Sequence, residues 1–101
     1  IWRNKGGNHA RILHAACFNG RPLVVKALIQ AGADVGKADD NGATALIVAS
    51  QNGHGAIVEA LIQAEADVDK ATNDGRTALM VASQEVHTAI VKALKTAGAK
   101  K

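Results

Sequence analysis

The chain has 101 residues, of which 48% are hydrophobic and 21% are charged, so it has the size of one folded domain and too many apolar residues for a disordered segment. Its net charge is +3, and the sign of the local charge alternates along the chain. Residues 1–38 carry six Lys or Arg against one Asp, residues 39–71 carry one Lys against six Asp or Glu, and residues 72–101 carry five Lys or Arg against two Asp or Glu. This alternation differs from the continuous basic surface expected of a nucleic-acid-binding protein.

The sequence also lacks the patterns that mark membrane insertion, secretion and disulfide bonding. No apolar run approaches the roughly 18 residues that a membrane helix needs, and no secretory signal pattern opens the chain. The single cysteine, Cys17, excludes a disulfide framework and indicates a reducing intracellular compartment. We expect the cytoplasm, with an organelle reached after N-terminal processing as the alternative. The start at Ile1 rather than methionine indicates a fragment or a processed chain.

The sequence repeats itself with a period of 33 residues. Residues 39–68 and 72–101 share 16 identities in 30 positions, among them the string VASQ. A weaker copy precedes them, in which AGADV at 31–35 matches AEADV at 64–68. Three units of one length predict a stacked array, in which each unit buries its apolar face against its neighbours. The predicted units form a single domain, 1–101, and span about 6–38, 39–71 and 72–101.

Each unit predicts the same elements in the same order: a turn, a short helix, a break, a longer antiparallel helix and a loop. In the first unit, Pro22 suits the first turn of the second helix. In the second unit, DDNG predicts a turn and Thr44 an N-cap, before a helix of about two turns. The third unit repeats this with TNDG and Thr77. The apolar stripe of the second helix is formed by Ile57, Val58, Leu61 and Ile62. The expected fold class is an all-α solenoid of helix–turn–helix units joined by β-turn or hairpin-like loops.

This pattern resembles the ankyrin-repeat family over roughly residues 6–101. The strings that carry the resemblance are DDNGATALIVASQNGHGAIVEALIQAEADVD and TNDGRTALMVASQEVHTAIVKALKTAGAKK. The first unit is degenerate at its start but keeps LHAA and GADV. The resemblance implies an ankyrin solenoid and does not identify a partner.

Several positions depart from the family pattern. Val86 replaces the glycine between the helices of the last unit, so we expect a locally altered or less stable loop there. Glu65 replaces the glycine that ends the second helix in a left-handed conformation. The last unit has a polar, cap-like end with Lys95, Thr96 and Lys100, and we expect residue 101 to lie close to the true end of the array.

Residues that could support catalysis or bind a metal have structural interpretations. His14 and Cys17 share a helix face, but no third group orients them, and the resemblance implies that His14 braces the backbone. His54 and His87 recur one period apart, without Cys or carboxylates at ligand spacing. No phosphate-binding loop, nucleophile elbow or zinc motif is present. We therefore predict no enzyme activity, no cofactor, no metal and no small-molecule substrate.

The resemblance implies a partner-binding surface made of the turn tips and the inner face of the first helices, together a concave strip. Carried over by position, the candidate residues at the tips are Asn8, Ala10, Asp40, Asn41, Ala43, Asn73, Asp74 and Arg76. The candidates on the helices are Phe18, Asn19, Gln51, Asn52, Gln84 and Glu85. Phe and Arg commonly anchor interfaces. Alternatively, these positions differ among the units because they face solvent without constraint.

Three functions remain open. The leading hypothesis is a protein–protein interaction module that docks another protein on its concave face without catalysis. The second is a structural or linker subunit held inside a larger multiprotein assembly, because the core is poor in large side chains and two loops depart from the pattern. The third and weaker hypothesis is binding of nucleic acid or another acidic surface through the basic first and third units.

Overall fold

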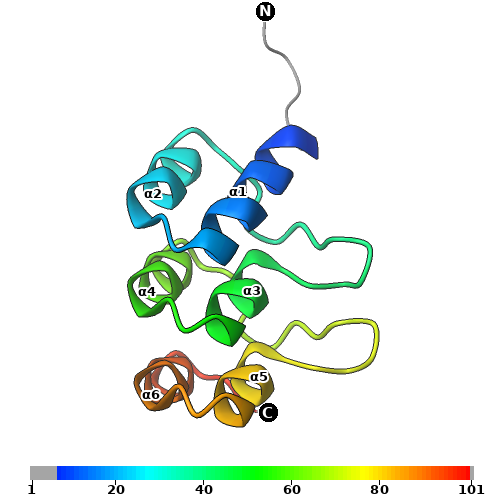
Figure 1. The fold of residues 1–101 in the computed structure, drawn as a ribbon, viewed down its shortest axis with the longest axis vertical. Coiled ribbons are helices and arrows are strands. Elements are labelled where there is room, and N and C mark those ends of the chain that lie inside the picture. The colour runs from blue at the N-terminus through cyan, green and yellow to red at the C-terminus, as the bar shows by residue number, and fades with distance from the viewer. Residues whose placement is uncertain (1–6, 101) are drawn as a thin grey trace, which may run out of the picture.

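The computed structural model describes residues 7–100, and their side chains from residue 9 onward. Six helices follow one another in this part of the chain: α1 (Gly7–Asn19), α2 (Pro22–Gln30), α3 (Ala45–Gln51), α4 (Gly55–Gln63), α5 (Ala78–Gln84) and α6 (Thr88–Thr96). They form three antiparallel pairs stacked along the long axis, which we call repeat 1 (α1–α2), repeat 2 (α3–α4) and repeat 3 (α5–α6) (Figure 1). The predicted all-helical solenoid is confirmed.

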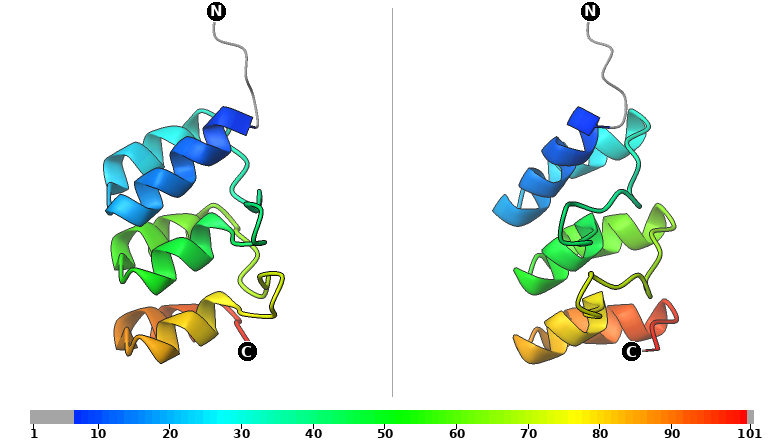
Figure 2. Two further views of the ribbon diagram at one scale, coloured as in Figure 1. Left: turned by 45° about the vertical axis from the view of Figure 1, so that its right-hand side comes forward. Right: turned by 90° about the vertical axis from the view of Figure 1, so that its right-hand side faces the viewer.

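The helices lie in two layers. The first helices of the pairs, α1, α3 and α5, form one layer, and the second helices form the other (Figures 1 and 2). The first helices pack closely on one another through small side chains: Ala45, Ala49, Ala78 and Ala82 are all buried. Larger aliphatic side chains fill the space between the layers, chiefly Leu13, Leu46, Val58, Leu61 and Leu94. The core therefore runs continuously through all three repeats, and each repeat contributes only part of it.

The predicted N-caps of α3 and α5 are confirmed. Thr44 and Thr77 adopt extended backbone conformations, and their Oγ1 atoms accept hydrogen bonds from the amides of Ile47 and Met80, each at 3.3 Å. Such a cap contributes about 1 kcal/mol to helix stability, which matters for helices of only seven residues. Pro22 lies in the first turn of α2, as predicted.

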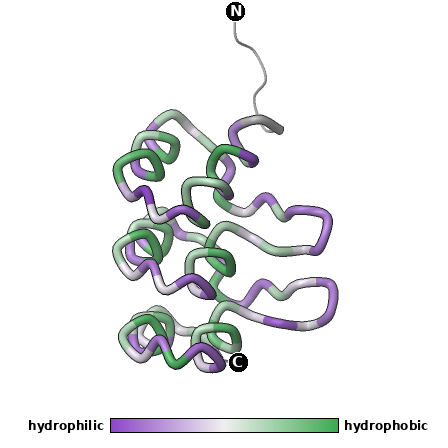
Figure 3. Tube along the Cα trace, viewed as in Figure 1, coloured by the Kyte–Doolittle hydropathy of each residue, from purple (hydrophilic) through white to green (hydrophobic). Residues whose placement is uncertain are grey.

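Two hairpin-like loops precede α3 and α5 and project away from the second helices. In the first, the amide of Asp39 donates to the carbonyl of Ala43, and in the second the amide of Thr72 donates to that of Arg76, both at 2.9 Å. The tips of the loops are largely hydrophilic (Figure 3). Asn73 joins the two loops, because its backbone amide donates to the carbonyl of Asn41 and its side chain to that of Asp40, both at 2.9 Å.

The start of repeat 1 differs from the prediction. Residues 7–11 are helical rather than a turn, so α1 has 13 residues and is longer than α2. The reason lies in the sequence: this unit has His9 where the others have turn residues and Arg11 where they have the capping threonine. Without those signals the helix extends toward the N-terminus. Asn8 and Ala10 are therefore not turn-tip residues, and the prediction that they are is wrong.

Histidines connect each repeat to the one before it. The Nε2–H of His54 donates to the carbonyl of Phe18 at the end of α1, and that of His87 donates to the carbonyl of Gln51 at the end of α3, both at 3.1 Å. Both bonds require close approach to glycine. A Cβ placed on Gly20 would lie 2.7 Å from the ring of His54, and one on Gly53 would lie 2.8 Å from the ring of His87. The interpretation of these histidines as structural residues of the loop is thereby supported.

A comparison of two glycines isolates the contribution of this contact. Gly20 and Gly32 both have positive φ values, 72° and 90°, but only Gly20 faces an imidazole. We expect Gly32→Ala to lower the free energy of unfolding by about 1 kcal/mol through backbone strain alone. Gly20→Ala should cost about 1–3 kcal/mol more, because the methyl group displaces His54 from the Phe18 carbonyl. Urea denaturation measures both changes, and equal losses would contradict this role for His54.

Two residues other than glycine occupy the left-handed region. Glu65 has a φ of 65° and Val86 a φ of 60°, close to the 78° of Gly53 at the position equivalent to Val86. The loop at Val86 keeps the hydrogen bond that follows the other first helices, from the amide of His87 to the carbonyl of Ala82 at 2.9 Å. The expected local alteration at Val86 is therefore limited to the hydrogen bonds beside this shared one, and the expected lower stability of the loop stays a prediction. The loop also gains bonds from the amide of Val86 to the carbonyl of Ser83 at 3.1 Å and from that of Thr88 to the carbonyl of Val86 at 3.0 Å, which the equivalent loop of repeat 2 lacks, and the β-branched side chain bears strain at its positive φ.

Relief of this strain is measurable. We expect Val86→Gly to raise the free energy of unfolding by about 1 kcal/mol, because glycine adopts a positive φ without steric conflict. Val86→Ala should recover less, since it removes the β-branch but keeps a Cβ. Urea denaturation of the original protein, Val86→Gly and Val86→Ala gives the order of their free energies of unfolding. If the Val86→Gly protein is less stable than the original, the exposed valine side chain stabilises the loop by more than its positive φ costs, and the prediction is contradicted.

Candidate functional site

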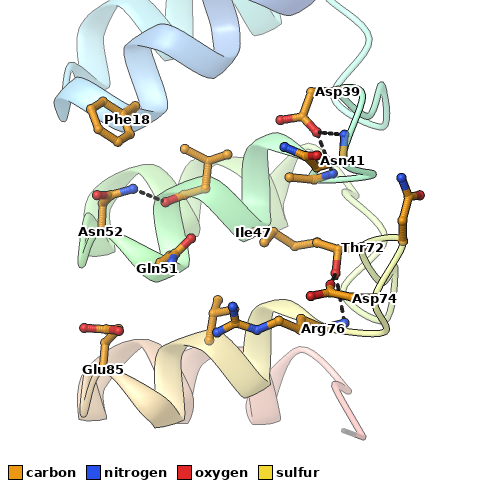
Figure 4. A pocket seen from close by; sticks show the side chains of 14 residues that line it. Phe18, Asp39, Asn41, Ile47, Gln51, Asn52, Thr72, Asp74, Arg76 and Glu85 are labelled. Carbon is orange, nitrogen blue, oxygen red and sulfur yellow. Dashed lines mark hydrogen bonds between the residues drawn. The ribbon is translucent and has the colours of Figure 1, made fainter.

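A groove of about 710 Å³ runs between the hairpins and the first helices (Figure 4). Residues from all three repeats line it, because the hairpins stand beside the exposed side of α3 and α5 and the end of α1 reaches over the groove. The lining residues are Phe18, Asp39, Asn41, Ala43, Ile47, Val48, Gln51, Asn52, Thr72, Asn73, Asp74, Arg76, Val81 and Glu85.

An exposed aromatic side chain lies at the end of the groove away from the hairpins, above the polar side chains of Asn52 and Glu85 (Figure 4). Phe18, in the last turn of α1, has 61% of its surface exposed (Figure 4). Its backbone is fixed, because its carbonyl accepts the hydrogen bond from His54. An exposed aromatic ring on a fixed backbone loses little conformational entropy when a partner covers it.

The hairpin end of the groove is polar, and part of its polarity is structural. The Oδ1 atom of Asp39 accepts hydrogen bonds from the amides of Asn41 and Ala43, both at 2.9 Å. In the second hairpin the hydroxyl of Thr72 donates to Asp74 and accepts from the amide of Arg76 at 3.0 Å. These side chains hold the turns in shape, so their replacement would change the groove by altering the hairpins.

The floor of the groove contains both bonded and free side chains. The guanidinium of Arg76 donates to the side chain of Gln84, and the amide of Asn52 donates to the carbonyl of Val48 at 2.8 Å. The exposed side chains of Gln51 and Glu85 have no such bond among the described residues. Figure 4 shows Glu85 extending from the end of α5 below Asn52 and Gln51. Gln51 and Glu85 can therefore bond a partner without losing an existing hydrogen bond.

The groove carries an excess of negative charge. Asp39, Asp74 and Glu85 contribute carboxylates, and Arg76 contributes the one guanidinium among the described lining residues. The first hairpin adds Asp40 beside the groove. A charged surface of this kind favours a partner of opposite charge and accelerates its approach.

The predicted site residues divide into three groups. Nine line the groove: Phe18, Asn41, Ala43, Gln51, Asn52, Asn73, Asp74, Arg76 and Glu85. Asn19, Asp40 and Gln84 are exposed close to it without lining it. Of the two residues wrongly assigned to a turn, Ala10 is buried in α1, and Asn8 lies in the first turn of α1 with its side chain outside the described part.

Sequence reasoning missed five lining residues: Asp39, Ile47, Val48, Thr72 and Val81. Asp39 and Thr72 open the two turns one period apart, and this shared position could have identified them. The three aliphatic residues gave no such signal. Ile47 and Val81 are almost fully buried and touch the groove only with their outer atoms, so by sequence they are core residues.

The possible Cys–His pair does not form. Cys17 is fully buried, and burial raises the pKa of its thiol to about 12. The Nε2–H of His14 instead donates to the carbonyl of Lys37 at 3.0 Å. The described residues contain no group of three or more His, Cys, Asp or Glu that could hold a metal ion. None of the helices in that part of the chain is long and apolar enough to span a membrane.

The buried thiol predicts low reactivity. The thiolate is the nucleophile, and a pKa near 12 leaves almost none of it at pH 8, so folded protein should label with a thiol reagent at least about a hundredfold more slowly than unfolded protein. The test is the rate of reaction with a chromogenic disulfide at pH 8, with and without urea. Equal rates would show that Cys17 is accessible in the folded state.

The geometry places the chain in the class of helical-repeat solenoids whose hairpins and first helices form a continuous groove. A family model described as ankyrin repeats (3 copies) matches residues 13–101, so the chain belongs to the ankyrin-repeat family. Ankyrin repeats generally mediate protein–protein interaction.

One relative illustrates how small a part of a protein such a segment can be. A stretch of 43 residues, 43% of this chain, is 51% identical to part of the E3 ubiquitin-protein ligase hecd-1 of Caenorhabditis elegans. The stretch covers 2% of that protein. The similarity therefore concerns the repeats and leaves the rest of that protein without a counterpart here.

Proposed function

We propose that this chain is a protein-binding module that takes its partner into the groove between the hairpins and the first helices, without catalysing a reaction. The observation that carries the proposal is the groove itself, with the exposed ring of Phe18 on a fixed backbone at one end, the carboxylate of Glu85 below it, and the carboxylates of Asp39 and Asp74 in the hairpins. Membership of a family that generally mediates protein–protein interaction supports it.

The chemistry of the groove favours a partner segment with basic and apolar side chains. Phe18 offers an aromatic surface to an apolar side chain or to the stem of an arginine. Glu85 and Gln51 offer acceptors that are not engaged within the described part of the chain, and the excess of carboxylates attracts positive charge. The contacts between Arg76 and Gln84 and between Asn52 and Val48 fix the floor on which the segment lies.

Affinity capture with matched variants tests the proposal. The groove variant is Phe18→Ala with Glu85→Lys. The control variant is Leu23→Ala with Glu59→Lys, which makes the same kinds of change and the same change of charge on the second helices. Both pairs change exposed side chains, so the fold should be retained. We expect the groove variant to lose at least about tenfold in affinity for any protein captured by the unaltered chain, and the control to lose less than about twofold.

The reverse order of effects would contradict the groove as binding site. If the control variant loses the partner and the groove variant keeps it, the partner binds the second helices. Circular dichroism of both variants verifies that neither loss follows from unfolding.

A second candidate function, a structural unit inside a larger assembly, is favoured by the strained backbone at Glu65 and Val86. A unit that depends on an assembly should melt near ambient temperature when isolated, whereas an independent module should unfold cooperatively well above it. Thermal melting of the isolated chain distinguishes the two.

A further inference from the structure

Three asparagines of this chain directly precede a glycine: Asn19, Asn41 and Asn52. In an Asn–Gly pair the backbone nitrogen of glycine can attack the side-chain carbonyl carbon of asparagine, because glycine has no Cβ to obstruct the approach. A bond forms between this nitrogen and Cγ, the bond from Cγ to Nδ2 breaks, and the amide leaves as ammonia with the proton of the glycine nitrogen. Water then opens the succinimide ring to aspartate or to isoaspartate, whose backbone contains one additional methylene group. The dipeptide is the same at all three sites, so we look to the fold for differences in rate.

Asn41 and Gly42 in the first hairpin are held by backbone hydrogen bonds. The amide of Gly42 donates to the carbonyl of Asp39, and the carbonyl of Asn41 accepts from the amide of Asn73, both at 2.9 Å. The surrounding space is filled, since a Cβ on Gly42 would lie 2.6 Å from Oδ1 of Asn73. Attack by the nitrogen of Gly42 therefore requires the two hairpins to separate first.

The side chain of Asn52 is held away from its glycine. Its Nδ2 donates to the carbonyl of Val48, one turn back along α3, at 2.8 Å. The carboxamide must leave this bond before its Cγ can meet the nitrogen of Gly53. A hydrogen bond of this kind shifts such an equilibrium by about twofold to tenfold.

Asn19 has no such restraint. It is the last residue of α1, where helices fray, and it is exposed. Among the described residues, no hydrogen bond involves its side chain. Asn19 and Asn52 lie one period apart and precede glycines of similar φ, 72° and 78°. The freedom of the side chain therefore distinguishes Asn19 from its equivalent in repeat 2.

The backbone at Asn19 also takes part in the contact between repeats 1 and 2. The carbonyl of Phe18, the residue before it, accepts from Nε2–H of His54 at 3.1 Å. The residue after it, Gly20, lies so close to the same imidazole that a Cβ there would be 2.7 Å from the ring. An additional backbone atom between Phe18 and Gly20 cannot leave both in place against His54. We propose that Asn19 is a site of deamidation, and that its isoaspartate product opens the histidine contact between repeat 1 and repeat 2.

Incubation of the folded protein at pH 8 tests the site. Samples are digested at intervals, and mass spectrometry follows the conversion of the amide in the three peptides. We expect Asn19 to react at least about threefold faster than Asn52, and Asn41 to react most slowly. In urea this order should disappear, because the restraints on Asn41 and Asn52 are lost. A rate at Asn19 no higher than that at Asn52, or the same order in urea, would overturn the assignment.

The effect on the contact is tested with the separated isoaspartate product, identified by its reaction with an isoaspartyl methyltransferase. Its matched control is the Asn19→Asp protein, which carries the same charge without the additional backbone atom. In urea denaturation we expect an unfolding constant at least about fivefold higher for the isoaspartate protein than for Asn19→Asp, because only the former loses the bond from His54. Equal constants would overturn the opening of the contact.

The Asn19→Gln protein shows whether any loss of stability during the incubation comes from this residue. Glutamine closes a larger and less favourable ring, so this protein should keep more of its stability than the original over the same time. An equal loss in the two proteins would assign the effect to another residue and overturn the role of Asn19.

Discussion

Close stacking of one helical pair on the next is the constraint on which this molecule depends. The first helices approach one another through alanine, and each contact between repeats includes a histidine that donates to a carbonyl of the repeat before it. That hydrogen bond needs a glycine opposite the imidazole, so Gly20 and Gly53 are as necessary as the histidines that they face. With few large side chains, the molecule gains its stability from repeated short contacts rather than from one bulky core.

The groove follows from the same stacking. Because the repeats lie in register, the two hairpins stand side by side, and Asn73 of one bonds the backbone of the other. The spacing of the hairpins is thus set in part by Asn73, which also lines the groove. Side chains at the groove surface, such as Phe18 and Glu85, can differ between repeats without disturbing the stack. A rigid frame with variable surface residues suits recognition of proteins.

Much of this could be predicted from the sequence, because each signal is local and recurs. The period of 33 residues, the capping threonines and the turn residues specify the helical pairs and the hairpins. The left-handed positions of Glu65 and Val86 also follow from their alignment with glycines. Repeat 1 was predicted less well, since its start lacks those signals and continues as helix. The buried contributions of Ile47 and Val81 to the groove could not be predicted, because their accessibility depends on how far the hairpins stand from the helices.

The binding of a partner in the groove is the central claim, and site-specific photo-crosslinking tests it most directly. A photoreactive amino acid would be placed at the position of Phe18 in one protein and at that of Leu23 in another, with the crosslinked products identified by mass spectrometry. The account predicts that a partner protein is crosslinked from position 18 and not from position 23. Crosslinking from position 23 alone would place the partner on the second helices and contradict the account.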